Sequence, residues 1–300
     1  MMSKIEKVLN DVRNIINEPR RQTIFLRDLK KRNQLCACLY TIWDSEVAIS
    51  PYKKTKKVTY LEIYGILQTL FVQQDAVSNL SFSVFGSSIE FKCDYSKLYE
   101  IRERRNDIIG HPTNRRNWES FHIIHRNSIS PEWFEYVSYL EDETPIRYMD
   151  IRNALKVQSE YLLIILKNMK KKLEKEQKVH KLKFKKNKLA SLSKIYHYHL
   201  GKLIDGVYSW YPLATQSLES LIGSYKKIKE GIVARYDDIN ALPWIENSVN
   251  KLDFLFSKIS SYFDGSWICE QIEIYIFVEA LGDELKLMED MLKEIDEDFS

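Results

Sequence analysis

Arg105 and His111 are the two residues of this chain whose types and spacing are best suited to chemistry. Five residues separate them, in the stretch Arg-Arg-Asn-Asp-Ile-Ile-Gly-His-Pro at positions 104–112. An imidazole exchanges a proton near neutral pH, and a guanidinium stays charged and binds phosphate oxygens through a planar set of donors. Together, two such groups have what is needed to cleave a phosphodiester bond in RNA without a metal ion.

The residues around this pair predict a helix that carries Arg105 on its buried side. Leu98, Ile101, Arg105 and Ile108 follow one another in steps of three and four, which is the spacing of one helix face. A charged group on such a face needs a partner or a cleft. We expect the helix to end just before His111, where the helix dipole favours a cationic imidazole.

Two alternatives to this pair remain open on the sequence alone. Arg104 competes with Arg105, because it would share a face with His111 if the helix continued through residue 111. Arg116 and His122 are also separated by five residues. The residues around His122 read as a strand, however, so we expect that second pair not to form the site.

The segment 101–112 resembles the motif helix of the HEPN superfamily (higher eukaryotes and prokaryotes nucleotide-binding domains), many of whose members are ribonucleases. The likeness includes the polar Asn106 directly after Arg105 and the proline directly after His111. The preceding helix, which contains Gln74 and Asp75, fits the helix that packs against the motif helix in such domains. The resemblance covers about residues 30–180.

This resemblance implies a metal-independent endoribonuclease of the toxin or phage-defence type. His111 would move a proton to or from the ribose 2′-hydroxyl or the leaving 5′-oxygen, and Arg105 would hold the scissile phosphate. A homodimer would bring two copies of the motif to one composite site. We expect Asn106 to position the arginine, and Gln74 or Asp75 to reach the motif.

The resemblance leaves open a second function, a non-catalytic HEPN-like adaptor that binds RNA or a protein partner. It also implies an antitoxin or another defence-system protein as a possible partner. One subset of the family carries a tyrosine two residues after the histidine, and this chain has Thr113 there instead.

Composition predicts a helical, globular protein. The chain is 44% hydrophobic and 29% charged, which disfavours global disorder, and it holds only nine glycines and seven prolines in 300 residues. No apolar stretch is long enough to span a membrane. The four cysteines are too scattered for a disulfide framework, so we expect a cytoplasmic protein.

Charge is unevenly distributed along the chain. Between positions 167 and 188 there are eleven lysines and only two acidic residues. Lysines of this kind contact phosphates without reading bases, and a solvated helix face is an equally good explanation. The candidate RNA contacts in this run are Lys170, Lys171, Lys172, Lys181 and Lys183.

The predicted fold class is all-α, with two domains. Residues 1–183 are expected to form a HEPN-like helical bundle with a short β-hairpin at about 119–138. Residues 184–300 are expected to form a C-terminal helical domain of unknown role. Expected helices span about 4–42, with a break near 18–19, then 58–80, 93–109 and from 148 to at least 178, and further helices follow with breaks near Pro212, Pro243 and Gly265.

The sequence gives no support for a metal or cofactor site. The glycines form no phosphate-binding loop. His122 with His125, and His197 with His199, lack further ligands at suitable spacing. We therefore expect neither a metal nor a cofactor.

Overall fold

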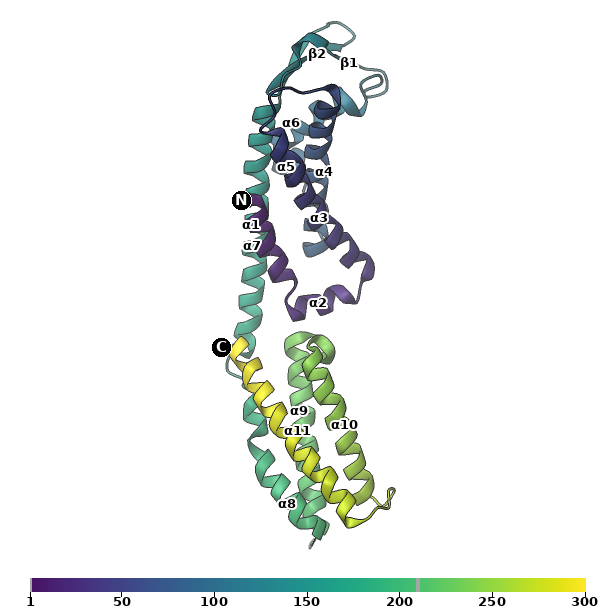
Figure 1. Cartoon of the computed structure of the whole chain (residues 1–300), viewed down its shortest axis with the longest axis vertical. Coiled ribbons are helices and arrows are strands. Elements are labelled where there is room, and N and C mark those ends of the chain that lie inside the picture. The colour runs from purple at the N-terminus through teal and green to yellow at the C-terminus, as the bar shows by residue number, and fades with distance from the viewer. Residues whose placement is uncertain (1, 209–210) are drawn as a thin grey trace. The chain divides into compact units, whose positions relative to one another are not determined.

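The computed structural model describes residues 2–208 and 211–300, and most of these residues are helical (Figure 1). The predicted all-α class with a small β-insertion is confirmed. The chain forms two compact units, each described separately below. The first unit comprises the residues up to Ile16 and Asp28–Leu173, and the second comprises Asn17–Arg27 and Glu174–Ser300. No helix in the described part of the chain is both long enough and apolar enough to cross a membrane.

The first unit is a helical bundle with a small sheet at one end. Its helices are α1 (Lys4–Ile16), α3 (Leu29–Tyr52), α4 (Tyr60–Phe85), the short α5 (Phe91–Asp94), α6 (Ser96–Arg105) and the first part of α7 (Ile151–Phe184). A capping box at Thr59 and Glu62 fixes the start of α4, and Gly86 (φ 74°) ends it in a left-handed conformation.

The helices α4 and α6 run in opposite directions, as do α6 and α7. Arg105 near the end of α6 contacts the early part of α4, whereas Gln74 in the middle of α4 donates a hydrogen bond to the Leu98 carbonyl (3.2 Å). Tyr95 before α6 packs on Tyr161 of α7, with ring centroids 5.9 Å apart. The end of α6, the start of α7 and the loop between α3 and α4 therefore lie at the same end of the bundle (Figure 1).

A network of buried amides joins α3, α4 and α7 inside this bundle. Gln158 donates to the side chain of Gln73 (3.1 Å) and to the Leu70 carbonyl (2.8 Å), and its side-chain oxygen accepts from Gln74 (2.7 Å). Gln73 in turn donates to Glu46 (2.9 Å). Each of these buried side chains is hydrogen-bonded, although Oε1 of Gln74 makes no hydrogen bond with the described residues. The network fixes the relative positions of these helices.

The sheet consists of three antiparallel strands in the order β1-β2-β3: β1 (Phe121–Ile124), β2 (Trp133–Tyr139) and β3 (Ile146–Asp150). In its register, Ile123 lies opposite Val137 and Glu135 lies opposite Tyr148. The expected hairpin is thus confirmed, but the expected start of the next helix at about 148 is wrong. The segment 146–150 pairs with β2, and α7 begins at Ile151 only after the third strand ends.

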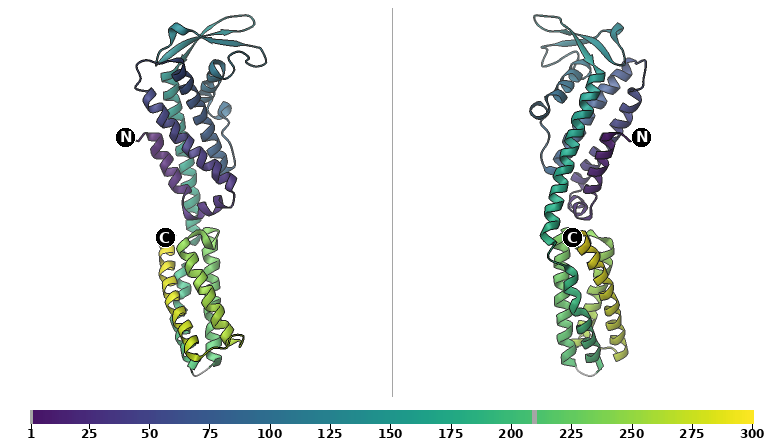
Figure 2. Two further views of the ribbon diagram at one scale, coloured as in Figure 1. Left: turned by 45° about the vertical axis from the view of Figure 1, so that its right-hand side comes forward. Right: turned by 90° about the vertical axis from the view of Figure 1, so that its left-hand side faces the viewer.

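The second unit is a helical bundle with its own core. Its main helices are α8 (Tyr196–Tyr208), α9 (Tyr211–Tyr236), α10 (Pro243–Phe263) and α11 (Gln271–Asp298), and Figure 2 shows them side by side. It also contains α2 (Pro19–Leu26), the end of α7 and a 3₁₀ segment (Leu189–Ile195). The breaks expected near Pro212, Pro243 and Gly265 fall at the start of α9, the start of α10 and the turn after α10.

An ion pair is buried in the second unit. The side chains of Arg235 and Asp296 are 1% and 7% exposed, and the two groups lie 3.1 Å apart. Asp296 also accepts hydrogen bonds from the backbone amides of Leu189 and Ala190, each 2.9 Å long. Burial lowers the pKa of Arg235, and the charge of Asp296 partly offsets that effect. One carboxylate therefore joins α9, α11 and the 3₁₀ segment.

The expected domain boundary at 183/184 is wrong. The division falls between Leu173 and Glu174, inside the continuous helix α7, and the segment Asn17–Arg27 belongs to the second unit. The lysine-rich composition of this stretch led to the wrong boundary, because the lysines mark solvent-facing positions of a helix that continues through it. Between those lysines, His180 bonds to the Arg235 carbonyl (2.8 Å) and Phe184 packs on Phe299.

Candidate active site

The helix that carries Arg105 ends in a wide turn. α6 continues directly into a π-helical segment, Asn106–Gly110, in which the amide of His111 bonds to the carbonyl of Asn106 (2.8 Å). The bond spans five residues, where an α-helix would span four. The expected end at Gly110 is confirmed, but the helix begins later than expected, since α5 ends at Asp94 and α6 starts at Ser96.

The guanidinium of Arg105 is held from two sides. Its Nη1 donates to Oδ1 of Asn106 (2.9 Å), and its Nη2 donates to Oε1 of Gln68 on α4. Its carbon Cζ lies 4.3 Å from the ring centroid of Phe71. A guanidinium has five N–H donors. Nη1 and Nη2 each use one of their two N–H groups in these bonds, so each keeps one for a further acceptor, whereas Nε is buried and makes no hydrogen bond with the described residues.

The charge of Arg105 is not neutralised by a carboxylate among the described residues. The nearby Asp75 is paired with Arg102 instead, at 2.7 Å. Burial lowers the pKa of Arg105, the charge of Arg102 lowers it further, and Asp75 raises it. A guanidinium stays protonated through such shifts. Arg105 is therefore a partly desolvated cation with spare donors, which suits it to an anionic ligand.

Gly110, which directly precedes His111, has no side chain and so leaves room for the guanidinium of Arg105. A Cβ atom placed on Gly110 would lie 2.7 Å from Nη1 of Arg105 and 3.1 Å from Oδ1 of Asn106. The guanidinium thus lies against the backbone at 110. The imidazole of His111 is exposed and makes no hydrogen bond or ion pair with the described residues.

We predict that Gly110→Ala displaces Arg105 with little effect on stability. The new methyl group requires the end of a flexible side chain to move, which costs little folding free energy but breaks the arrangement with Asn106. RNA cleavage should fall about tenfold, since small displacements of reacting groups are costly. Gly65→Ala on α4 is the control, because nothing lies within 4 Å of its added Cβ. Equal activity of both variants would contradict the prediction.

The second arginine–histidine pair does not form a site. His122 is buried in β1, where its Nδ1 lies 2.9 Å from Ser138 Oγ and its Nε2 lies 3.1 Å from Ser120 Oγ. Burial lowers the pKa of His122, and Asp107 opposes that shift. Arg116 is exposed and pairs with Glu103 (3.0 Å).

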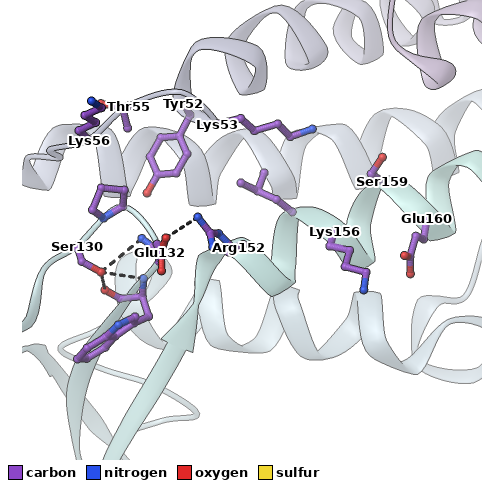
Figure 3. Close-up of a pocket in the computed structure, with 13 residues that line it drawn as sticks. Tyr52, Lys53, Thr55, Lys56, Ser130, Glu132, Arg152, Lys156, Ser159 and Glu160 are labelled. Atoms are coloured by element: carbon purple, nitrogen blue, oxygen red, sulfur yellow. Dashed lines mark hydrogen bonds and ion pairs between the residues drawn. The ribbon is translucent and has the colours of Figure 1, made fainter.

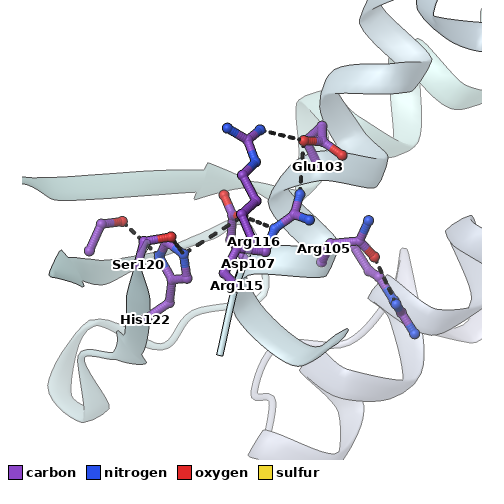
Figure 4. Close-up of polar contacts among 9 residues, drawn as sticks. Glu103, Arg105, Asp107, Arg115, Arg116, Ser120 and His122 are labelled. Atoms are coloured by element: carbon purple, nitrogen blue, oxygen red, sulfur yellow. Dashed lines mark hydrogen bonds and ion pairs between the residues drawn. The ribbon is translucent and has the colours of Figure 1, made fainter. Parts of the chain in front are cut away.

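These contacts belong to a polar cluster that joins the π-helical turn to the sheet. Arg115 donates to both Asp107 (2.9 Å) and Glu103 (2.8 Å), and Figure 4 shows Arg105 directed away from this cluster. The cluster fixes the end of α6 against β1. Its role is therefore to support the turn that carries Arg105 and His111.

The competing arginine has a structural partner. Arg104 donates to the backbone carbonyl of Tyr148 on β3 and pairs with Glu100 (2.6 Å). These bonds hold α6 against the sheet. Arg105, which has no carboxylate partner among the described residues, is the better candidate for binding a phosphate.

The two expected supporting residues of α4 differ in their contacts. Gln74 is fully buried and bonds to Gln158 and the Leu98 carbonyl. It does not bond to Arg105 or His111. Asp75 reaches the site through Arg102, which lies over the same Phe71 ring as Arg105, 4.1 Å from its centroid.

Sequence analysis expected Asn106 to position Arg105 but missed Gln68 and Phe71, which contact its guanidinium from α4. Gln68 and Phe71 lie three residues apart on α4, and Asp75 follows four residues later, so the three form one face against α6. The pattern of this face could have been found in the sequence, but it does not reveal which helix packs on it. Gln68 is exposed and looked like an ordinary solvent-facing residue.

The candidate RNA-binding lysines of the first unit do not share one helix face. Lys170, Lys171 and Lys172 are consecutive on α7, so each side chain points about 100° away from the one before it. Lys170 pairs with Asp11 (2.7 Å), and Lys172 lies 3.9 Å from the ring centroid of Phe85. Lys181 and Lys183 belong to the second unit and also point in different directions.

Within residues 2–208 and 211–300, no group of three or more His, Cys, Asp or Glu side chains is arranged to hold a metal ion.

Compared with known proteins, the chain matches no family model, no curated protein and no solved structure.

Proposed function

We propose that this chain is an endoribonuclease that cleaves RNA without a metal ion, and that Arg105 and His111 carry the reaction. The observation that supports this most is the state of Arg105. Its guanidinium is partly desolvated, has no carboxylate partner among the described residues, and lies against the backbone beside His111. A phosphate is the ligand that such a group binds best.

The proposed reaction follows from the chemistry of the Arg105 guanidinium and the His111 imidazole. The 2′-oxygen of a ribose attacks the adjacent phosphorus, and the bond between phosphorus and the 5′-oxygen breaks. A base takes the proton of the 2′-hydroxyl, and an acid gives a proton to the leaving 5′-oxygen. The products are a 2′,3′-cyclic phosphate and a 5′-hydroxyl. Arg105 stabilises the negative charge that develops on the phosphate oxygens.

One chain supplies one suitable histidine to this site, whereas the reaction needs both an acid and a base. A two-fold dimer that brings two copies of His111 to one phosphodiester supplies both groups. The exposure of His111 is compatible with such a meeting. The dimer is part of the proposal.

The test is cleavage of a mixed-sequence RNA in the presence of a chelator. Wild-type protein should cleave it and leave 2′,3′-cyclic phosphate ends, and His111→Ala should be at least about 100-fold slower. The matched controls are His125→Ala and Arg126→Ala, because both side chains are exposed in the turn between β1 and β2.

Three results would count against the proposal. Wild-type protein that cleaves no RNA at any concentration tested would favour the non-catalytic adaptor. Activity that disappears with the chelator would indicate a metal-dependent enzyme. Activity that survives in His111→Ala would remove this histidine from the reaction.

A further inference from the structure

A cavity of about 790 Å³ lies at the sheet end of the first unit, apart from the residues discussed above. Its walls come from the end of α3, the loop after it, the turn before β2 and the first turns of α7. This volume lies within the range of small-molecule sites. The lining residues used below are Tyr52, Lys53, Lys56, Trp133, Arg152 and Lys156.

The walls of this cavity are fixed by hydrogen bonds. The carbonyl of Glu132 accepts from the amides of Ile151 (2.8 Å) and Arg152 (3.1 Å), which attaches the turn before β2 to the start of α7. Ser130 Oγ donates to the Trp133 carbonyl (2.6 Å) and accepts from its amide (3.0 Å). The cavity is therefore formed before any ligand binds, which reduces the entropic cost of binding.

The lining carries an excess of positive charge. Four cationic side chains face two carboxylates, Glu132 and Glu160. Arg152 is paired with Glu132, whereas Lys53, Lys56 and Lys156 have no ion pair among the described residues. Three lysines from two different segments thus surround the cavity without an acidic partner. This arrangement attracts an anion.

A buried hydroxyl group in the wall also lacks a partner. The phenol oxygen of Tyr52 is inaccessible to solvent and makes no hydrogen bond with the described residues. Figure 3 shows it directed toward Glu132 and Arg152, which line the same cavity. Burial raises the pKa of Tyr52 to about 12, and the charge of Glu62 adds to the effect, so the group remains a donor at neutral pH. A buried donor without a partner is rare, and a small movement of the cavity wall that exposes this hydroxyl would let a ligand oxygen satisfy it.

An aromatic side chain completes the lining. Trp133 is 41% exposed, and Tyr148 packs against it with ring centroids 5.9 Å apart. A large exposed ring held in place by a neighbour is a stacking surface for a planar group. The cavity therefore offers lysines for an anion and an indole for a flat ring.

We propose that this cavity binds a nucleoside phosphate, with its phosphate toward Lys53, Lys56 and Lys156 and its base against Trp133. Tyr52 donates a hydrogen bond to a ligand oxygen. The same chemistry is present in a free mononucleotide and in a nucleotide of an RNA strand, and the experiment below separates the two. The proposal does not depend on the nuclease activity.

The test is calorimetric titration of the whole chain with a nucleoside 5′-monophosphate. We expect one site per chain with a Kd below about 1 mM. Combining Lys53→Ala with Lys156→Ala should weaken binding at least about tenfold, a change of about 1.4 kcal/mol. Tyr52→Phe, which removes only the hydroxyl, should weaken it about fivefold. The matched control is Lys54→Ala, whose side chain does not line the cavity.

Further ligands identify what is bound. An uncleavable 2′-O-methyl RNA oligonucleotide that binds more tightly than the mononucleotide, and loses affinity in the same variants, shows that the natural ligand is an RNA strand. Tighter binding of the mononucleotide points to a free nucleotide.

Three results would overturn the proposal. The first is an absence of saturable binding of either ligand. The second is that Lys54→Ala weakens binding as much as the Lys53→Ala and Lys156→Ala combination does. The third is an affinity for inorganic phosphate equal to that for the mononucleotide. Thermal unfolding of each variant confirms that a loss of binding is not a loss of fold.

Discussion

Replacing Arg105 with lysine should slow RNA cleavage by about 100- to 1,000-fold, although the positive charge is kept. The reason is geometric. The guanidinium is held by Asn106 and Gln68 and still has donors to offer, whereas an ammonium group is a point charge on a flexible chain. Lysine cannot bond to both partners and bind two phosphate oxygens in the same plane. The measurement is the single-turnover rate at saturating RNA.

The matched control for this variant is Arg116→Lys, because Arg116 belongs to the pair that does not form a site. It is exposed and pairs only with Glu103, so the rate should stay within about twofold of the wild type. Thermal unfolding should be similar for both variants. An Arg105→Lys protein with the wild-type rate would show that Arg105 does not contact the transition state.

Replacing Asp296 with alanine should lower the free energy of unfolding of the second unit by about 3–5 kcal/mol. The substitution leaves the buried guanidinium of Arg235 without its carboxylate and removes the acceptor of two backbone amides. An uncompensated buried charge is among the most destabilising changes that a single substitution makes. Urea unfolding followed by circular dichroism measures the loss.

Asp298→Ala provides the comparison within the same helix. Asp298 is exposed, so its removal should change the free energy of unfolding by less than about 1 kcal/mol. If Asp296→Ala unfolds at the same urea concentration as Asp298→Ala, the ion pair contributes no net stability. Binding of a nucleoside phosphate should be unchanged in both variants, because the proposed cavity lies within the first unit.

The helices and the position of Arg105 were predictable because they depend on local patterns. The spacing of Leu98, Ile101 and Ile108 predicted the buried face of α6 and of the π-helical segment after it, and Arg105 is partly buried on that face. Glycine at 110 gave the end of the segment. Local patterns could not predict the π-helical turn, because a regular α-helix over the same residues would place the apolar side chains on one face equally well.

The remaining features depend on contacts between distant segments. Gln68 lies 37 residues before Arg105, and no property of either residue alone predicts their hydrogen bond. The strand at 146–150 forms only because β2 offers a free edge, and its residues by themselves fit the start of a helix equally well. Tyr52 was not a candidate residue for the same reason, since its hydroxyl loses solvent only when α7 and β2 pack near it.

The π-helical turn has a consequence for how the chain tolerates changes in length. Because the amide of His111 reaches back five residues, the segment 106–110 contains one residue more than a regular helical turn would need. Shortening it by one residue would convert the wide turn into a regular α-helical turn, because five residues of the first and four of the second complete about the same rotation. Such a deletion would preserve a continuous helix and leave the imidazole on nearly the same side. The wide turn can thus absorb a change of one residue in the spacing between the two side chains.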